Sequence, residues 1–233
     1  MGKLDSAVGG FFPQYVIDKY IEKDGYWIHD GNPLRPHVQL TSGKHSGGFF
    51  NSDQLLHDYH FFHIIAHKFM AILASLGYSP KEIQKAIGPA MGAIFFAHHL
   101  GGVVSHENGR LCPSGYAEKG FDSEGKKIMT FNRTKVSRGE RLLLGDDVIT
   151  TGGTLDLTID AIDLVEALTT EYIFALINRS GRTHIRGRKI LALYENHLPN
   201  YEPEDCLYCK MGSIALRAKE GSNWQFLHQH YPE

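Results

Sequence analysis

Residues 141–154, RLLLGDDVITTGGT, constrain the fold more than any other part of the sequence. The segment begins with a short apolar run, RLLL, of the kind that forms a buried strand. Gly145, two adjacent aspartates and a β-branched link follow, and the glycine-rich turn TTGGT then leads directly into an amphipathic helical pattern. A strand, a glycine-rich turn and a helix in this order are typical of a parallel sheet, with the turn at the carboxyl end of the strand.

This turn also has the chemistry of a phosphate site. Glycine amides, threonine hydroxyls and a helix N-terminus gather around one point, which binds phosphate without a lysine. Asp146 and Asp147 precede the turn, and carboxylates accept hydrogen bonds from sugar hydroxyls and bind hydrated Mg²⁺. A ribose 5-phosphate satisfies both halves. An ordinary strand, turn and helix cap is the alternative, and the coincidence of all three parts in order favours the phosphate site.

The composition narrows the class of protein. The 233 residues allow one full domain with a small accessory region, and no apolar run approaches the roughly 20 residues that span a bilayer. The net charge of -2 gives no general attraction to nucleic acid or anionic lipid. We therefore expect neither membrane insertion nor nucleic-acid binding. The N-terminus lacks a signal-peptide pattern, and three cysteines are too few for a disulfide framework, so we expect a cytoplasmic protein.

Strand and helix patterns alternate through the middle of the chain, which predicts an α/β core at about residues 55–194 with a mainly parallel sheet flanked by helices. Residues 105–127 are rich in Gly, Ser, Glu and Lys and are predicted to be a long exposed loop. Residues 1–40 and 195–233 lack the alternation, so we expect them to form an accessory subdomain within a single domain, 1–233. The predicted helices are 61–76, 93–100 and 155–168, and the predicted strands are 83–88, 128–131, 142–144, 172–177 and 189–193.

The segment 141–154 resembles the phosphoribosyl diphosphate (PRPP) signature of type I phosphoribosyltransferases. Further segments narrow the resemblance to orotate phosphoribosyltransferases, over about residues 36–212. The resemblance implies the type I phosphoribosyltransferase fold with a small hood subdomain. It also implies an Mg²⁺-dependent transfer in which a nucleobase, orotate before others, is joined to PRPP with release of pyrophosphate. The implied assembly is a homodimer whose catalytic loop reaches a neighbouring site.

Four other segments carry this resemblance. HVQLTSGKHSGGFFNSD resembles the substrate segment whose aromatic pair lies over the base, and AIGPAMGAIFFA resembles the pyrophosphate loop. FNR at 131–133 resembles the start of the catalytic loop, and the Asn-Arg pair at 178–179 resembles the strand end whose Arg meets the orotate carboxylate. The resemblance therefore assigns PRPP binding to Lys44, Gly88, Pro89, Ala90, Met91, Gly92, Asp146, Asp147, Thr150, Thr151, Gly152, Gly153 and Thr154; base binding to Phe49, Phe50, Thr150 and Arg179; catalysis to Arg133, Lys135 and Asp147; and Mg²⁺, directly or through water, to Asp146 and Asp147.

Departures from the family pattern keep two alternatives open. Members commonly place several lysines and a histidine in a long catalytic loop, whereas here only RTKVSRGER separates Asn132 from the next strand, with Lys135 as the nearest candidate. Some members carry a lysine where Thr41 or Gly92 stands. The alternatives are a phosphoribosyltransferase for a purine, xanthine or uracil, and a PRPP-binding regulator without catalysis.

Cys206 and Cys209 form a CxxC pair in YEPEDCLYCKMG, which resembles the tail of some family members. Such a pair binds zinc only together with two further ligands, and Cys112 and His197 are the candidates that we consider. A CxxC pair without a second pair is a weak signal, so the alternative is that both residues remain simple thiols.

Overall fold

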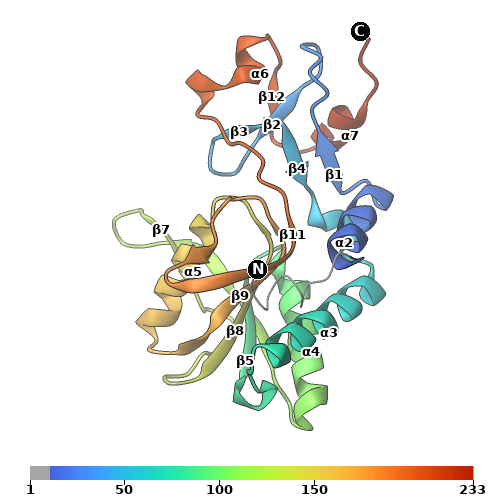
Figure 1. Cartoon of the computed structure of the whole chain (residues 1–233). Helices are drawn as coiled ribbons and strands as arrows, with labels where there is room; N and C mark the ends of the chain where they lie inside the picture. The colour runs from blue at the N-terminus through green and yellow to red at the C-terminus, as the bar shows by residue number, and fades with distance from the viewer. Residues whose placement is uncertain (1–10, 233) are drawn as a thin grey trace. The chain divides into compact units, whose positions relative to one another are not determined.

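The computed structural model describes residues 11–232 and divides them into two compact units (Figure 1). Unit 1 comprises the described residues up to Val16 together with Leu56–Asn196, and unit 2 comprises Ile17–Leu55 together with the described residues from His197 onward. The first described helix, α2 (Phe11–Glu22), contributes residues to both units. Within residues 11–232, none of the helices combines the length and the apolar character that crossing a membrane requires.

Unit 1 is built on a seven-stranded sheet in the order β10-β11-β9-β8-β5-β6-β7. The five inner strands run parallel, and the two edge strands are antiparallel to their neighbours. The predicted α/β fold with a mainly parallel sheet is therefore confirmed. The strands are β5 (Lys85–Pro89), β6 (Ser114–Phe121), β7 (Lys127–Thr130), β8 (Arg141–Ile149), β9 (Leu168–Asn178), β10 (His184–Ile185) and β11 (Arg188–Glu195).

Helices cover both faces of this sheet, with α3 (Tyr59–Ser75) and α4 (Ala93–Asn108) together on one side and α5 (Gly153–Leu164) on the other (Figure 1). Side chains alternate between the two faces of a strand, and β9 shows both contacts. Phe174 stacks on Phe69 of α3 with ring centroids 4.6 Å apart. Its neighbour Ile173 lies instead in a buried cluster with Leu155 and Ile159 of α5. A short helix, η2 (Pro80–Glu82), precedes β5.

The segment predicted as a long exposed loop, 105–127, is the main error of the sequence-based assignment. Helix α4 continues to Asn108, and β6 then pairs with β5 in parallel and with β7 in antiparallel register. Only Ala117 of β6 is buried, so the strand contains polar residues and glycines that resemble a loop in composition. The predicted helix 155–168 was also too long, because α5 ends at Leu164 and β9 begins at Leu168.

Unit 2 contains two small sheets that draw on both ends of the chain. Strand β1 (Tyr26–Ile28) pairs with β4 (Gly48–Phe50), and β2 (His37–Gln39) lies between β3 (His45–Ser46) and β12 (Ala215–Leu216). Trp27, Val38 and Leu227 share one buried cluster, and the Trp27 indole donates to the Leu227 carbonyl oxygen at 2.7 Å. The remaining helices are η1 (Ser52–Leu55), η3 (Pro203–Asp205), α6 (Leu207–Lys210) and α7 (Asn223–His228).

Candidate active site

Two adjacent aspartates, Asp146 and Asp147, lie near the carboxyl end of β8. Asp146 is buried, Asp147 is half-buried, and the Asp147 amide donates to Asp146 Oδ1 at 3.0 Å. Burial raises the pKa of Asp146 well above its ordinary value, and the negative charge of Asp147 raises it further. Burial and repulsion therefore disfavour two bare negative charges at this point, and a cation or hydroxyl donors would stabilise the ionised pair.

The turn after β8, residues 150–154, leads into the N-terminus of α5. Gly152 adopts a left-handed conformation with φ of +86°, which favours glycine, and Gly153 is the first residue of the helix. The first amides of a helix have no acceptor within the helix and carry partial positive charge. Thr151 and Gly153 are exposed, while Thr150 and Thr154 are half-buried. The predicted phosphate-binding turn thus presents hydroxyls and amides at the end of β8.

Arg182 braces this turn from the segment after β9. Its Nη1 donates to the Thr151 carbonyl oxygen at 3.2 Å and to Asp156 Oδ2 at 3.0 Å. A β-carbon on Gly152 would lie only 2.6 Å from the same Nη1. The glycine therefore serves both the backbone conformation and the close approach of the arginine.

The loop between β5 and α4 reaches the acid pair. A β-carbon on Gly92 would lie 2.6 Å from both carboxylate oxygens of Asp147, so the Gly92 backbone stands directly beside that carboxylate. Gly88 is buried in β5, where a β-carbon would lie 2.6 Å from that of Ala93. The loop and the acid pair therefore meet without intervening side chains. The other loop residues are Pro89, which ends β5, Ala90, which is half-buried, and Met91, which is exposed and follows a cis peptide bond.

Lys119 brings a positive charge to the same edge of the sheet. It is an exposed residue of β6, and its charge lowers the pKa of Asp146, opposing the effects of burial and of Asp147. Lys119 therefore lies within electrostatic reach of the acid pair. The sequence does not point to this residue, because the half-exposed strand that carries it resembles a loop in composition.

The two residues predicted as catalytic, Arg133 and Lys135, lie in the segment between β7 and β8. The Arg133 side chain is 75% exposed, with Nε 3.5 Å from Glu118 Oε1. Both residues line a groove of about 670 Å³ that also involves residues of α4, β5 and β6. The segment is anchored by Thr134, which is buried and accepts a hydrogen bond from the Tyr116 amide at 2.9 Å, and by Lys85, whose ammonium donates to the Lys135 carbonyl oxygen.

Among the residues predicted to bind the base, Arg179 belongs to unit 1. It follows β9, is only 1% exposed, and its amide donates to the Ile149 carbonyl oxygen at 3.0 Å. This hydrogen bond places the arginine beside the end of β8. Asn178 shapes the adjoining turn, because its Oδ1 accepts from the Ser180 amide at 3.1 Å and its Nδ2 donates to the Arg182 carbonyl oxygen at 2.9 Å.

The other predicted substrate residues, Lys44, Phe49 and Phe50, belong to unit 2. Phe50 is buried and stacks on Tyr26 with ring centroids 4.7 Å apart. Phe49 is half-buried on the opposite face of β4 and packs near Trp224 at 5.9 Å. Lys44 forms an ion pair with Glu202 at 2.6 Å and is 39% exposed. Phe49 and Lys44 therefore keep part of their surface open to a ligand.

Comparison with known proteins shows the family. No family model matches the chain. The orotate phosphoribosyltransferase of Pelotomaculum thermopropionicum is 31% identical over 189 residues, which is 80% of this chain and 90% of the relative. That of Desulforamulus reducens is 30% identical over the same length and coverage. The chain belongs to the orotate phosphoribosyltransferase family. A solved structure of an orotate phosphoribosyltransferase from Aeropyrum pernix shares its fold, with a TM-score of 0.54 at 18% identity over 77% of this chain and 93% of that one.

For a member of the orotate phosphoribosyltransferase family, the chemical capacity of unit 1 is clear. The turn and the loop beside Gly92 offer amides to anions, the acid pair offers oxygens to hydroxyls or a hard cation, and Lys119 offers positive charge. All these groups come from elements at the carboxyl edge of parallel strands or beside it, where open α/β sheets bind their ligands.

Proposed function

We propose that the chain is an Mg²⁺-dependent orotate phosphoribosyltransferase, which joins orotate to PRPP and releases pyrophosphate. The observation that carries this proposal is the direct approach of the Gly92 backbone to the Asp147 carboxylate, beside the turn at residues 150–154. A ligand held there needs two anionic groups separated by a hydroxylated ring. PRPP has that structure, and the names of the curated relatives supply orotate as its partner.

Each part of the site has one task in this proposal. The amides and hydroxyls of residues 150–154 hold the 5-phosphate, and the amides of residues 88–92 hold the diphosphate. Asp146 and Asp147 accept hydrogen bonds from the ribose hydroxyls and offset the positive charge that the ribose develops when the diphosphate departs. Catalysis then depends mainly on positioning and on charge.

The donor set at the acid pair fits Mg²⁺. Two neighbouring carboxylates offer the oxygen ligands that hard cations prefer, and a bound cation would favour the ionised form of Asp146, whose pKa burial and the charge of Asp147 raise. Asp146 and Asp147 would hold the ion directly or through water. Bound Mg²⁺ supplies charge neutralisation for the leaving pyrophosphate.

Lys119 is the cation that we assign to the leaving pyrophosphate before Lys135. It lies two residues beyond Ala117, which pairs with Pro89 at the loop assigned to the diphosphate, and its charge lowers the pKa of Asp146. Lys119→Ala should lower kcat by about 10-fold or more, as expected for the loss of one electrostatic contact in a transition state. Lys135→Ala is the matched comparison. A larger fall in kcat for Lys135→Ala than for Lys119→Ala would assign the catalytic role to Lys135 instead.

Arg179 is the residue of unit 1 that we assign to orotate, because its amide donates to the carbonyl oxygen of Ile149, the neighbour of Thr150. The family resemblance adds Thr150 itself and, from unit 2, Phe49. A guanidinium binds a carboxylate with two parallel hydrogen bonds, and orotate is a base that carries a carboxylate. Arg179→Lys should therefore raise the KM for orotate more than the KM for PRPP. Equal effects on both constants would indicate a general structural role instead.

The decisive assay is formation of orotidine monophosphate by the purified chain with PRPP, Mg²⁺ and orotate. The double substitution of Asp146 and Asp147 by Asn should abolish turnover, whereas Asp163→Asn, on the exposed side of α5, should not change it. Turnover with a purine, xanthine or uracil but not with orotate would overturn the substrate. Tight PRPP binding without turnover on any base would favour a regulator.

We further propose that the enzyme acts as a homodimer in the cytoplasm. The resemblance to the family supports the dimer, and the lack of a disulfide between any two of Cys112, Cys206 and Cys209 fits a reducing compartment. Light scattering on the purified chain should give twice the mass of 26.1 kDa. A monomer with full activity would contradict a site that needs the neighbouring subunit.

A further inference from the structure

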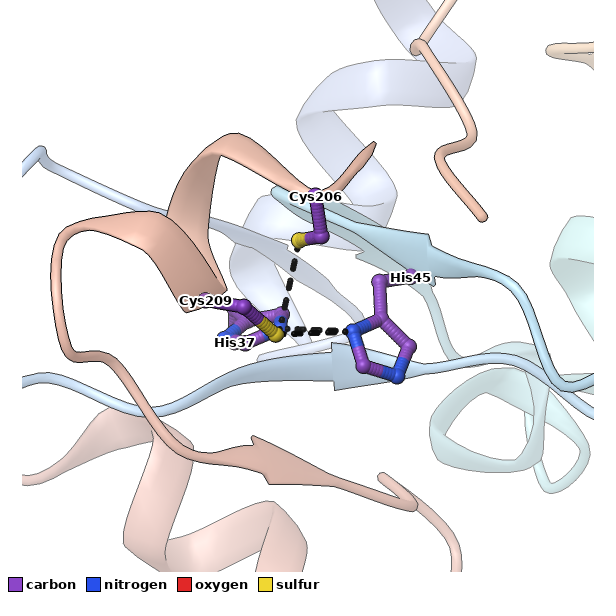
Figure 2. Close-up of side chains that lie close together, drawn as sticks. All are labelled: His37, His45, Cys206 and Cys209. Atoms are coloured by element: carbon purple, nitrogen blue, oxygen red, sulfur yellow. Dashed lines mark hydrogen bonds between the residues drawn. The ribbon is translucent and has the colours of Figure 1, made fainter. Parts of the chain in front are cut away.

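Four potential metal ligands in unit 2 converge on one point (Figure 2). His37 comes from β2, His45 from β3, Cys206 from the cap of α6 and Cys209 from α6 itself. One ligand atom of each residue lies within 4.8 Å of the other three. His37 and Cys206 are 0% exposed and His45 is 6% exposed. The potential ligands beside the CxxC pair are therefore two histidines, and the candidates considered from the sequence, Cys112 and His197, are not in this group.

Four of the six distances between ligand atoms in this cluster are close to those of a tetrahedral zinc site. Zinc bonds nitrogen at about 2.0–2.1 Å and sulfur at about 2.3 Å, which places tetrahedral ligand atoms about 3.3–3.8 Å apart. His37 Nε2 lies 3.1 Å from His45 Nδ1 and 3.5 Å from each of the two sulfur atoms. His45 Nδ1 lies 3.3 Å from the Cys209 sulfur. The side chains thus already stand close to the separations that the metal imposes.

Hydrogen bonds alone do not satisfy this arrangement. The Ser213 hydroxyl donates to the Arg35 carbonyl oxygen at 2.6 Å, so its oxygen accepts the Nδ1–H of His37 at 2.9 Å. The lone pair of neutral His37 is then on Nε2, and His45 Nδ1 and the sulfur atoms of both cysteines all lie close to that nitrogen. One lone pair accepts a single donor well, whereas a cation accepts electron pairs from all four residues. The Ser213 contact is also the outer-shell hydrogen bond that orients a metal-binding histidine.

The surrounding residues hold the four ligands in place. Tyr208, between the two cysteines in sequence, stacks on the His37 ring with centroids 5.5 Å apart. A β-carbon on Gly47 would overlap the Tyr208 hydroxyl, so this ring packs directly on the backbone next to β3. Two backbone hydrogen bonds of 2.8 Å join His45 to Tyr201, which precedes the CxxC pair. The site is therefore preorganised from both chain segments.

We propose that His37, His45, Cys206 and Cys209 form a structural zinc site that fastens the C-terminal segment of unit 2 to the β2–β3 hairpin. Two thiolates and two imidazoles select zinc rather than the oxygen-seeking Mg²⁺. Four protein ligands leave no open position for a substrate, so the site is structural. It lies wholly in unit 2, and it does not depend on the proposed transferase activity.

The first test is the zinc content of the full-length chain, purified without chelators and measured by plasma mass spectrometry. We expect about one zinc per chain, as a single closed site predicts. Cys206→Ser with Cys209→Ser should remove the zinc, and Cys112→Ser, which changes the cysteine of unit 1, should leave it in place. Wild-type protein that lacks zinc even after incubation with Zn²⁺ and desalting would overturn the proposal, as would full zinc content in the double variant.

A second measurement covers the case in which the double variant does not fold. Replacing the metal of the wild-type chain by Co²⁺ should produce the absorption bands of tetrahedral cobalt together with thiolate-to-cobalt charge transfer. A strong chelator should also shift the wild-type melting transition downward, because metal binding to the folded state contributes to folding. An octahedral cobalt spectrum without thiolate bands would refute this ligand set. The same melting curve with and without chelator would refute the structural role.

Discussion

The substitution Gly88→Ala should weaken both the fold of unit 1 and PRPP binding. The new β-carbon would lie 2.6 Å from the Ala93 β-carbon, 2.8 Å from the Ala93 carbonyl oxygen and 3.0 Å from the Gly145 carbonyl oxygen. Carbon atoms in contact normally lie about 3.5–4.0 Å apart, so the overlap with Ala93 is about 1 Å. Two of the three atoms belong to the backbone of α4 and β8, so relief requires that a helix or a strand move. Overpacking of this kind costs about 1–3 kcal/mol.

Thermal melting and steady-state kinetics test this reasoning. For a chain of this size, a loss of about 1–3 kcal/mol in the free energy of unfolding lowers the melting temperature by about 2–12 °C. The KM for PRPP should rise as well, because Gly88 begins the loop assigned to the diphosphate. Gly102→Ala is the matched control: it lies in α4, and its β-carbon would meet no described atom within 4 Å outside the helix backbone, so stability should hold or rise. Wild-type melting and KM in Gly88→Ala would refute the argument.

Three further predictions concern buried ionisable groups of unit 1. Lys85→Met should lower the free energy of unfolding, measured in urea, by about 3–5 kcal/mol, because it leaves the Glu140 carboxylate without its cation. Glu140 is 15% exposed and lies 2.8 Å from the Lys85 ammonium. Burial lowers the pKa of His99 to about 4, so His99 is neutral in the folded state. The free energy of unfolding should therefore fall by up to about 3 kcal/mol as the pH drops from 6.5 toward 4, because the unfolded chain binds a proton at His99 and the folded chain does not. Burial raises the pKa of the Cys112 thiol to about 11, so iodoacetamide at pH 8 should label it only after unfolding.

Each of these predictions has its own control. Lys85→Met combined with Glu140→Leu should recover most of the lost stability, and a double variant as unstable as the sum of both single variants would contradict the coupling. His99→Phe should flatten the pH dependence between 6.5 and 4, and an unchanged slope would assign it to other groups. Fast labelling of Cys112 in folded protein, followed by peptide mapping, would show that burial does not protect the thiol.

The parts of the site that could be predicted from the sequence are local. The acid pair and the turn at residues 150–154 follow one another in the chain, so one short segment carries the strand, the carboxylates and the helix N-terminus. Lys119 could not be found this way, because β6 is half-exposed and its composition resembles a loop. His37 and His45 were missed as partners of the CxxC pair for a different reason. They lie more than 160 residues from it, and neither has a local metal-binding pattern.

Unit 2 has a consequence for the order in which the chain completes its structure during synthesis. Strands β1 to β4 are made before the seven-stranded sheet, but Val38 and Trp27 lack their partner until Leu227 has been made. The sheet of unit 1 is complete once β11 has left the ribosome, whereas unit 2 still waits for residues that follow β11. A chain that stops before Cys206 would keep two histidines without thiols and an uncovered apolar surface. Chaperones and proteases recognise such surfaces, so a chain that stops there is open to both.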